Sequence, residues 1–168
     1  MFLRWLGDAD MAGKRLYFFI ILILSLALIT AGCSKGNSNA ITGNSVAADS
    51  VTILKDSSCG CCDVYVSYMV KKGFNADTKT TNMESVKEKY GIPYSMRSCH
   101  TTVIGDYFVE GHVPIEAVEK LMLEKPDIKG IALPGMPSGS PGMPGSKQGP
   151  FIVYAINKDG STSEFMRI

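Results

Sequence analysis

The residues of this sequence best suited to chemistry are three neighbouring cysteines, Cys59, Cys61 and Cys62, which only one glycine interrupts. A fourth cysteine, Cys99, follows further along the chain. Thiolates are soft ligands, and a cluster of thiolates favours copper(I) over harder metal ions. Cys59 and Cys62 also have the spacing of a dithiol redox motif, but a dithiol that exchanges disulfides needs no third neighbouring thiolate. The pattern therefore favours a copper(I) site over a redox site.

Two histidines and two methionines complete the set of candidate ligands. His100 directly follows Cys99, and His112 lies at the end of a predicted strand. Met136 and Met143 belong to a segment rich in proline and glycine. Imidazole and thioether groups both bind copper. We therefore expect both histidines to be ligands beside the four cysteines, with the two methionines as secondary candidates.

The cysteines have three other uses that the sequence leaves open. A thiol-disulfide oxidoreductase would use Cys59 and Cys62 as its redox pair, with Cys61 or Cys99 as a resolving thiol. A structural disulfide is available to any protein in an oxidising compartment. Four cysteines can also form a tetrahedral zinc site, although such sites usually take their ligands from two separated pairs. Because three sulfurs here come from one tight segment, we favour a multinuclear copper-thiolate arrangement.

The cysteine cluster requires a strand and a helix to position it. Residues 51–54 form a short β-branched run that predicts a buried strand, and Asp56 opens a stretch typical of helix caps. Apolar residues at three- and four-residue spacing predict a helix over residues 62–72, which Gly73 ends. The cysteines then lie on the first turn of this helix. There the helix dipole and the free N–H groups favour thiolates and lower the pKa of a thiol.

The remaining patterns predict a mixed α/β fold. A second strand, a short helix, a hairpin, a further helix, a proline- and glycine-rich loop and a final hairpin follow one another, over residues 74–80, 82–91, 101–109, 114–122, 133–145 and 151–168. This order is that of a thioredoxin-like protein, with a central mixed β-sheet flanked by helices and a C-terminal β-hairpin. Ligand sites in such sheets lie at the carboxyl end of the strands, where Cys99 would face the other three sulfurs.

The N-terminal region has the layout of an export signal. Lys14 and Arg15 precede an apolar run over residues 16–29, which is too short for an ordinary membrane span. Small residues then lead to Cys33, as in the lipobox of bacterial lipoproteins, and a small polar segment follows. We therefore predict three parts, namely a signal peptide, a lipidated Cys33 with a flexible tether, and a thioredoxin-like metal-binding domain, over residues 1–32, 33–50 and 51–168.

Composition supports one folded domain with appendages. The chain has 168 residues, of which 45% are hydrophobic and 20% are charged, and its formal net charge is +1. The charged residues are scattered, so no basic stripe is available to neutralise the phosphates of a nucleic acid. We therefore exclude nucleic acid as a partner and expect an extracytoplasmic protein, in the periplasm or at the cell surface, held at the membrane by its lipid.

Read in order, four motifs resemble those of the CopG-type copper-resistance family. They are Cys59-Gly-Cys-Cys62, Ser98-Cys-His100, Val109-Glu-Gly-His-Val-Pro114 and the proline, glycine and methionine run over residues 133–143. The resemblance implies a periplasmic thioredoxin-like protein, often encoded beside copper-export systems, that binds copper through the four cysteines of the domain. It also implies a role in copper redox interconversion. The predicted tether through Cys33 departs from the many family members that look soluble.

These observations lead to one working interpretation. We expect an extracytoplasmic copper(I)-binding protein of copper handling and resistance, with a thiolate cluster and a role in copper redox interconversion. Its partners would be copper ions, copper-export or cuproenzyme proteins, and the membrane through the lipid anchor. We interpret the chain as a metal-binding protein rather than an enzyme and assign no catalytic residue. The alternative is a thiol-disulfide oxidoreductase that uses Cys59 and Cys62.

Overall fold

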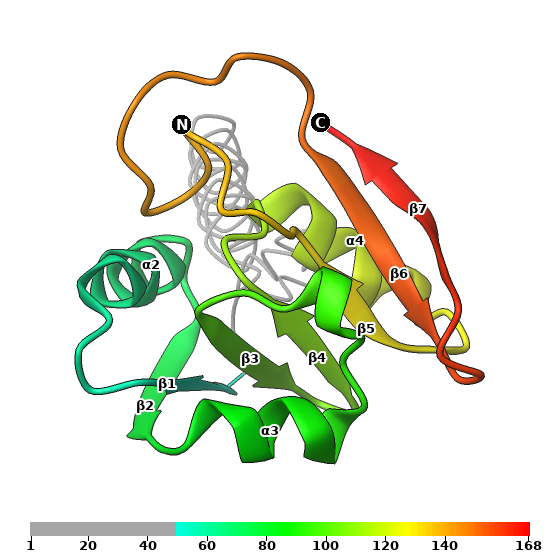
Figure 1. Ribbon diagram of the computed structural model, residues 1–168. Helices are drawn as coiled ribbons and strands as arrows, with labels where there is room; N and C mark the ends of the chain where they lie inside the picture. Colours follow the sequence, from blue (N-terminus) through cyan, green and yellow to red (C-terminus); the bar gives the residue numbers. More distant parts are fainter. Residues whose placement is uncertain (1–49) are drawn as a thin grey trace, which may run out of the picture. The chain divides into compact units, whose positions relative to one another are not determined.

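One seven-stranded sheet organises residues 50–168, the part of the chain that the computed structural model describes (Figure 1). The predicted signal peptide, the lipidated Cys33 and nearly all of the tether lie outside these residues. The strands are β1 (Ser50–Lys55), β2 (Asn75–Thr80), β3 (His100–Ile104), β4 (Tyr107–Glu110), β5 (Ile128–Ala132), β6 (Ile152–Asn157) and β7 (Thr162–Arg167). The helices are α2 (Gly60–Lys71), α3 (Met83–Tyr90), the 3-10 helix η2 (Tyr94–Met96) and α4 (Ile115–Glu124). None of these described helices has the length and hydropathy that crossing a membrane requires.

The sheet is mixed, with the strand order β2-β1-β3-β4-β5-β6-β7. Strand β1 runs parallel to β2, and β4 runs parallel to β5, while the other neighbouring pairs are antiparallel. The predicted mixed α/β fold is confirmed, and the C-terminal hairpin of β6 and β7 extends the sheet as its last two strands. The narrower thioredoxin-like label stays a prediction.

Helix α2 begins where the sequence predicts a capped start. The carboxylate of Asp56 accepts hydrogen bonds from the backbone N–H of Ser58 at 2.9 Å and from its hydroxyl at 2.7 Å. This local turn ends β1 and brings the chain to Cys59, the N-cap residue, whose side chain makes no capping hydrogen bond. The helix buries one face against the sheet through Cys62, Tyr65 and Met69. The cysteines therefore lie at the N-terminus of α2, as predicted.

The structure contains one strand that the sequence patterns do not predict. Strand β5 follows α4 and lies inside the sheet, where it pairs in parallel with β4 and antiparallel with β6. Its five residues include Lys129 and Gly130, so they show neither a β-branched run nor a clear alternation. Gly130 is required there, because an added Cβ would clash with the backbone and ring of Phe108.

The sheet carries an apolar core on each face. Helices α2 and α4 cover one face, where the larger core includes Tyr65, Met69 and Leu121. Helix α3 lies across the sheet from them (Figure 1), over a smaller core that includes Ile92 and Phe108. Because side chains alternate along a strand, neighbouring residues of β3 and β4 face different cores. This alternation decides which residues can reach the cysteines.

Candidate metal centre

The pairing of two strands brings the four cysteines together. Strand β1 ends just before Cys59, and its last residue, Lys55, is the register partner of His100 at the start of β3. Cys99 therefore emerges beside the N-terminus of α2. The four cysteine sulfurs all lie within 4.8 Å of one another. The Sγ atom of Cys61 lies 3.6 Å from that of Cys59 and 4.0 Å from that of Cys99.

Two of the four sulfurs are joined in a disulfide, between Cys59 and Cys62, whose Cα atoms are 5.4 Å apart. Cys61 and Cys99 remain free thiols and are half-buried. In this oxidised state Cys59 and Cys62 cannot act as thiolates. The cluster thus combines one disulfide with two free thiols, so a metal site that uses all four sulfurs requires reduction of the disulfide, whereas the disulfide itself is compatible with thiol-disulfide exchange.

The spacing of the sulfurs suits a shared metal ion. Thiolates bound at about 2.3 Å to one tetrahedral ion are roughly 3.8 Å apart. The separations from Cys61 to Cys59 and to Cys99, at 3.6 and 4.0 Å, bracket this value. Once the disulfide is reduced, a metal ion could therefore bind between the sulfurs at the N-terminus of α2 and the sulfur of Cys99.

Cys99 is also the centre of a second group of potential ligands, with His100 and His112. Its Sγ atom lies 3.1 Å from Nε2 of His112 and 3.3 Å from Nδ1 of His100. Burial, assisted by the neighbouring sulfur of Cys61, raises the pKa of Cys99 to about 11. Cys99 is therefore a thiol at neutral pH, so a metal ion that binds its sulfur must displace the proton.

His112 has the arrangement of a metal-ligating histidine. Its Nδ1 atom lies 2.7 Å from the carbonyl oxygen of Pro141. A carbonyl can only accept a hydrogen bond, so Nδ1 carries the proton and Nε2 directs its lone pair towards Cys99. Burial lowers the pKa of His112, while the Pro141 carbonyl acts against this shift. Proteins commonly orient metal ligands in this way, with the second ring nitrogen held by a backbone carbonyl.

His100 is more deeply enclosed. Its ring centroid lies 4.5 Å from that of Tyr65 and 4.8 Å from that of His112. Burial, together with the neighbouring His112, lowers the pKa of His100 to about 3, so the ring is neutral near neutral pH. Among the described residues, no group forms a hydrogen bond with its buried Nε2 atom. A metal role for His100 stays a prediction.

The proline- and glycine-rich segment between β5 and β6 arches over this end of the sheet beside α2 (Figure 1). Gly142 has a φ of +83°, and a Cβ added to it would lie 3.0 Å from the backbone nitrogen of Tyr65 and 3.2 Å from the carbonyl oxygen of Cys61. The segment is therefore packed directly on the first turn of α2. This contact and the hydrogen bond from His112 make the segment an ordered cover on one side of the cluster.

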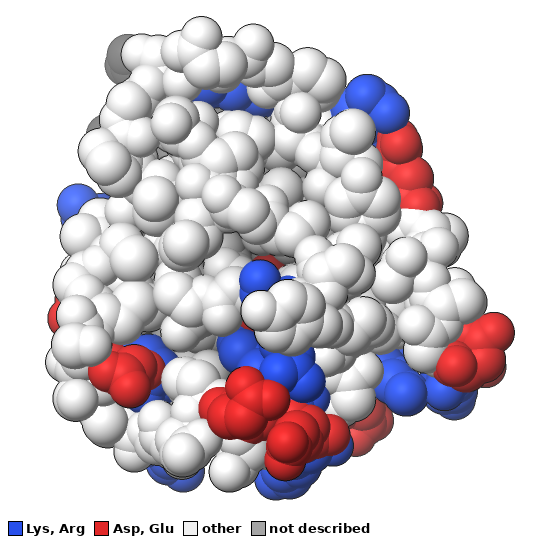
Figure 2. Space-filling view, in the orientation of Figure 1, with Lys and Arg blue, Asp and Glu red and all other residues white. Residues whose placement is uncertain are grey.

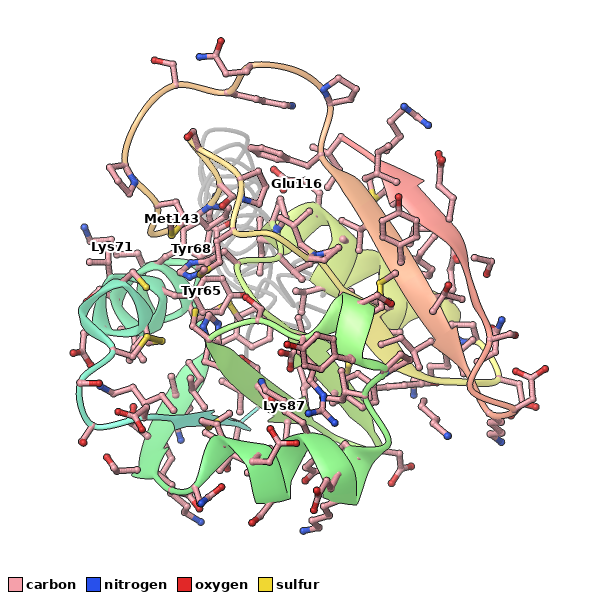
Figure 3. All side chains as sticks on the ribbon, in the orientation of Figure 1. Tyr65, Tyr68, Lys71, Lys87, Glu116 and Met143 are labelled. Carbon is pink, nitrogen blue, oxygen red and sulfur yellow. A yellow bond between two sulfur atoms is a disulfide. The ribbon has the colours of Figure 1, made fainter. Side chains whose placement is uncertain are left out.

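The two candidate methionines occupy different places on this segment. Met143 follows Gly142 and lies at the level of α2 (Figure 3). Met136 lies on an outer turn, and 39% of its surface is exposed. Figure 2 shows few charged side chains in the upper left and centre of the view, whereas charged side chains gather in its lower part, over α3, and along its right edge, near β7. The ligand role of both methionines stays a prediction.

The sequence patterns do not predict the buried ion pair between Lys87 and Glu110, which lies behind Cys99. Nζ of Lys87 lies 2.6 Å from Oε1 of Glu110, and both side chains are almost completely buried. Burial lowers the pKa of Lys87 and raises that of Glu110, while each charge favours ionisation of the other. The sequence carries only a weak signal, because Thr101 is a polar residue on one predicted strand and Glu110 directly follows its predicted partner strand. Only the register of β3 and β4 shows that they meet.

The fold and the site together define a small mixed α/β protein with a cluster of sulfur and imidazole groups that could hold metal. A protein-family profile described as "Protein of unknown function, DUF411" matches residues 96–143, which include Cys99 and both histidines. No curated protein matches the chain.

Two solved structures extend the comparison to most of the chain. They are forms 2 and 1 of "Copper resistance protein copG", with sequence identities of 39% and 40% and TM-scores of 0.67 and 0.66. Each match covers 71% of this chain, and the matches cover 98% and 96% of the respective solved chains. The chain therefore belongs to the CopG copper-resistance family, which confirms the family predicted from its motifs.

Proposed function

We propose that this protein is an extracytoplasmic copper(I)-binding protein of copper handling and resistance. The reduced cysteines of one cluster, Cys59, Cys61, Cys62 and Cys99, hold the copper, with His112 as a nitrogen ligand and His100 beside it. The observation that carries the proposal is the convergence of four sulfurs, from α2 and from the start of β3, within 4.8 Å of one another. Soft thiolates in a cluster favour copper(I), and the solved relatives are copper resistance proteins.

Binding requires a change in the chemical state of the cluster. Two electrons and two protons convert the Cys59–Cys62 disulfide into two thiols, and metal binding then displaces the thiol protons. His112 already presents Nε2 as a lone pair, because the Pro141 carbonyl holds the proton on Nδ1. The segment around Gly142 limits the access of water and oxidants to the bound metal.

The same cysteine pair supports copper redox interconversion. Oxidation of the Cys59 and Cys62 thiols to the disulfide releases two electrons and two protons, which balances the reduction of two copper(II) ions to copper(I). The disulfide between these residues, with Sγ of Cys61 3.6 Å from that of Cys59, supports this proposal because it is the product that the exchange would leave. An external reductant of the thiol class would return the pair to its reduced state.

We also propose that the protein acts at a membrane surface outside the cytoplasm. A signal peptide would export the chain, and lipidation of Cys33 would anchor it through the tether, close to copper-export or cuproenzyme partners. Incorporation of labelled palmitate that Cys33→Ser abolishes would support the anchor. Equal labelling of the variant, or none of the parent chain, would contradict it.

An anaerobic copper(I) titration tests the binding proposal. The reduced full-length chain carrying Cys33→Ser would be compared with a variant in which Cys59, Cys61 and Cys62 are also serine. The expected result is tight binding of more than one copper ion per chain, with thiolate-to-copper charge-transfer absorption that the variant lacks. A titration with zinc in parallel shows whether the cluster prefers the softer ion. Equal binding by both proteins would overturn the proposal.

A second candidate function is thiol-disulfide exchange, which the observed Cys59–Cys62 disulfide favours. In this reading Cys61, only 3.6 Å from Cys59, is the resolving thiol. Insulin reduction by the metal-free protein, lost in Cys59→Ser, would support the oxidoreductase. Inactivity together with tight copper(I) binding would remove it.

A further inference from the structure

We propose that Glu110 and Lys87 are positioning residues that fix Cys99 against the sulfurs of α2. The proposal deepens the proposed function, on which it rests, because it concerns the only sulfur of the cluster that does not come from the start of α2. It assigns a role to a buried ion pair that touches none of the candidate ligands directly.

The pair lies on the opposite face of the sheet from most of the candidate site. Thr101 of β3 is the register partner of Glu110 of β4, and both side chains face α3. Lys87 reaches them from α3 (Figure 3). The preceding residue, His100, faces the α2 side, where its ring packs on Tyr65.

Glu110 is linked to the chain next to Cys99 by a direct hydrogen bond. Its Oε1 atom accepts the backbone N–H of Ser98 at 2.5 Å. The same carboxylate receives Nζ of Lys87 at 2.6 Å and, at Oε2, the hydroxyl of Thr101 at 2.7 Å. The Lys87 ammonium also donates to the Thr101 hydroxyl at 2.8 Å. These contacts hold the Glu110 carboxylate in one position, where it accepts the hydrogen bond from the Ser98 N–H.

The segment before β3 depends on this acceptor because its other neighbours allow little adjustment. A Cβ added to Gly111, whose φ is +80°, would lie 2.7 Å from the side chain of Ser98. The N–H of Gly111 also bonds the carbonyl oxygen of His100 at 3.1 Å. Cys99 thus lies between two residues that the end of β4 holds in place. Its sulfur is thereby directed to within 4.0 Å of Cys61.

A purely stabilising ion pair would behave differently from a positioning pair. Buried ion pairs can often be replaced by apolar side chains of similar volume without loss of stability, whereas removal of one partner is costly. If Lys87 and Glu110 only filled space, replacement of both would leave Cys99 in place. If Glu110 positions Cys99, the distance between Cys99 and Cys61 depends on whether residue 110 still accepts a hydrogen bond from Ser98.

A disulfide between Cys61 and Cys99 can report, without copper, how well Cys99 is held next to Cys61. In the full-length chain, Cys33→Ser, Cys59→Ser and Cys62→Ser leave Cys61 and Cys99 as the only thiols. Their exchange with glutathione disulfide forms one Cys61–Cys99 disulfide and releases two reduced glutathiones. The equilibrium constant gives the effective concentration of one thiol at the other.

Three double variants in this background separate the roles. Lys87→Met with Glu110→Gln removes both charges and keeps the acceptor, whereas Lys87→Met with Glu110→Met removes the acceptor as well. Asp127→Asn with Lys158→Met is the matched control, because it neutralises an exposed ion pair at the other end of the sheet. We expect the acceptor-free variant to lower the effective concentration at least about tenfold. The other two variants should stay within about threefold of the parent.

Two results would overturn the proposal, namely an unchanged equilibrium in the acceptor-free variant, or an equal loss in the variant that keeps the acceptor. Should the acceptor-free variant not fold, hydrogen exchange at the Ser98 amide of the parent decides the matter, since the proposal requires strong protection there and rapid exchange contradicts it. Neither readout involves copper. Failure of the copper titration would therefore refute the proposed function while leaving this measurement intact.

Discussion

At the scale of single residues, the two histidines beside Cys99 have different environments. Nδ1 of His112 bonds the Pro141 carbonyl, which leaves Nε2 free to face the sulfur at 3.1 Å. His100 is completely enclosed and lacks a hydrogen bond at Nε2 among the described residues. His112 is therefore oriented by its hydrogen bond, and His100 by packing against Tyr65.

Removal of the oriented imidazole should weaken metal binding. We expect His112→Ala to lower the affinity of the reduced protein for copper(I) at least about tenfold, as is typical when an oriented group of a metal site is lost. A competition titration against a copper(I) chelator measures this change. The cysteine ligands remain, so thiolate charge-transfer absorption should persist. An unchanged affinity would show that His112 is not a ligand.

The enclosure of His100 predicts an acid-sensitive fold. Burial lowers its pKa from 6.5 to about 3, so between these values the unfolded chain binds the proton and the folded chain does not. The free energy of unfolding of the metal-free, oxidised protein should be highest above pH 6.5. It should fall by up to about 1.4 kcal/mol per pH unit below that value, until the pH approaches the folded pKa.

Urea unfolding at several pH values, compared between the parent and His100→Gln, tests this expectation. The slope should become shallower in the variant without vanishing, because the lowered pKa of His112 acts in the same direction. Identical slopes in the two proteins would contradict the assignment to His100.

At the scale of elements, the segment between β5 and β6 should act on the site through Gly142. Gly142→Ala adds a Cβ at a φ of +83°, within 3.2 Å of Nδ1 of His112 and of the carbonyl oxygen of Cys61. We expect this change to destabilise the fold by about 1–2 kcal/mol and to weaken copper(I) binding by disturbing His112.

Gly149→Ala is the matched control for this prediction. Gly149 lies on the same segment, and an added Cβ would meet no atom within 4 Å. Thermal unfolding and copper(I) titration of both variants provide the comparison. Equal effects of the two substitutions would show that the close contact at Gly142 does not matter.

The sequence predicts elements well where local signals are strong. Asn82 caps α3 by accepting the Ser85 N–H, and Gly91 ends it at a φ of +61°, as the sequence indicates. The local patterns do not predict strand β5, because Gly130 interrupts its apolar run. A glycine is needed at this position because the backbone lies close to Phe108, and this tertiary contact leaves no mark on the local sequence pattern. The sequence shows polar residues at Thr101 and Glu110, but local patterns do not predict that Lys87 meets them, because this contact also depends on the register of β3 and β4. The sequence predicts that Cys99 meets the other three cysteines only when the thioredoxin-like order of strands is assumed.

At the scale of the whole molecule, a metal centre would join three separate parts of the chain. The candidate ligands come from the start of α2, the start of β3 and the bend after β4, and the segment between β5 and β6 covers them. A ligand that binds only the folded state stabilises it according to its concentration and affinity. Copper(I) should therefore stabilise the entire described fold rather than one loop.

Thermal unfolding provides the measurement for this prediction. At a copper(I) concentration about 100-fold above the dissociation constant, the reduced protein should gain about 2.7 kcal/mol and its Tm should rise by roughly 5–15 °C. The oxidised protein should gain less, because its disulfide removes Cys59 and Cys62 as ligands. Equal rises in the two states would show that copper binds elsewhere.

The central claim is that copper(I) is held by a cluster of cysteine sulfurs at the N-terminus of α2 and directly before β3. X-ray absorption at the copper edge of the reduced, copper-loaded full-length chain tests it most directly. The account predicts a first shell dominated by sulfur with a copper-copper contribution, and a loss of sulfur scattering when Cys61 and Cys99 are replaced by serine. A first shell of nitrogen and oxygen alone, or a spectrum unchanged by those substitutions, would contradict it.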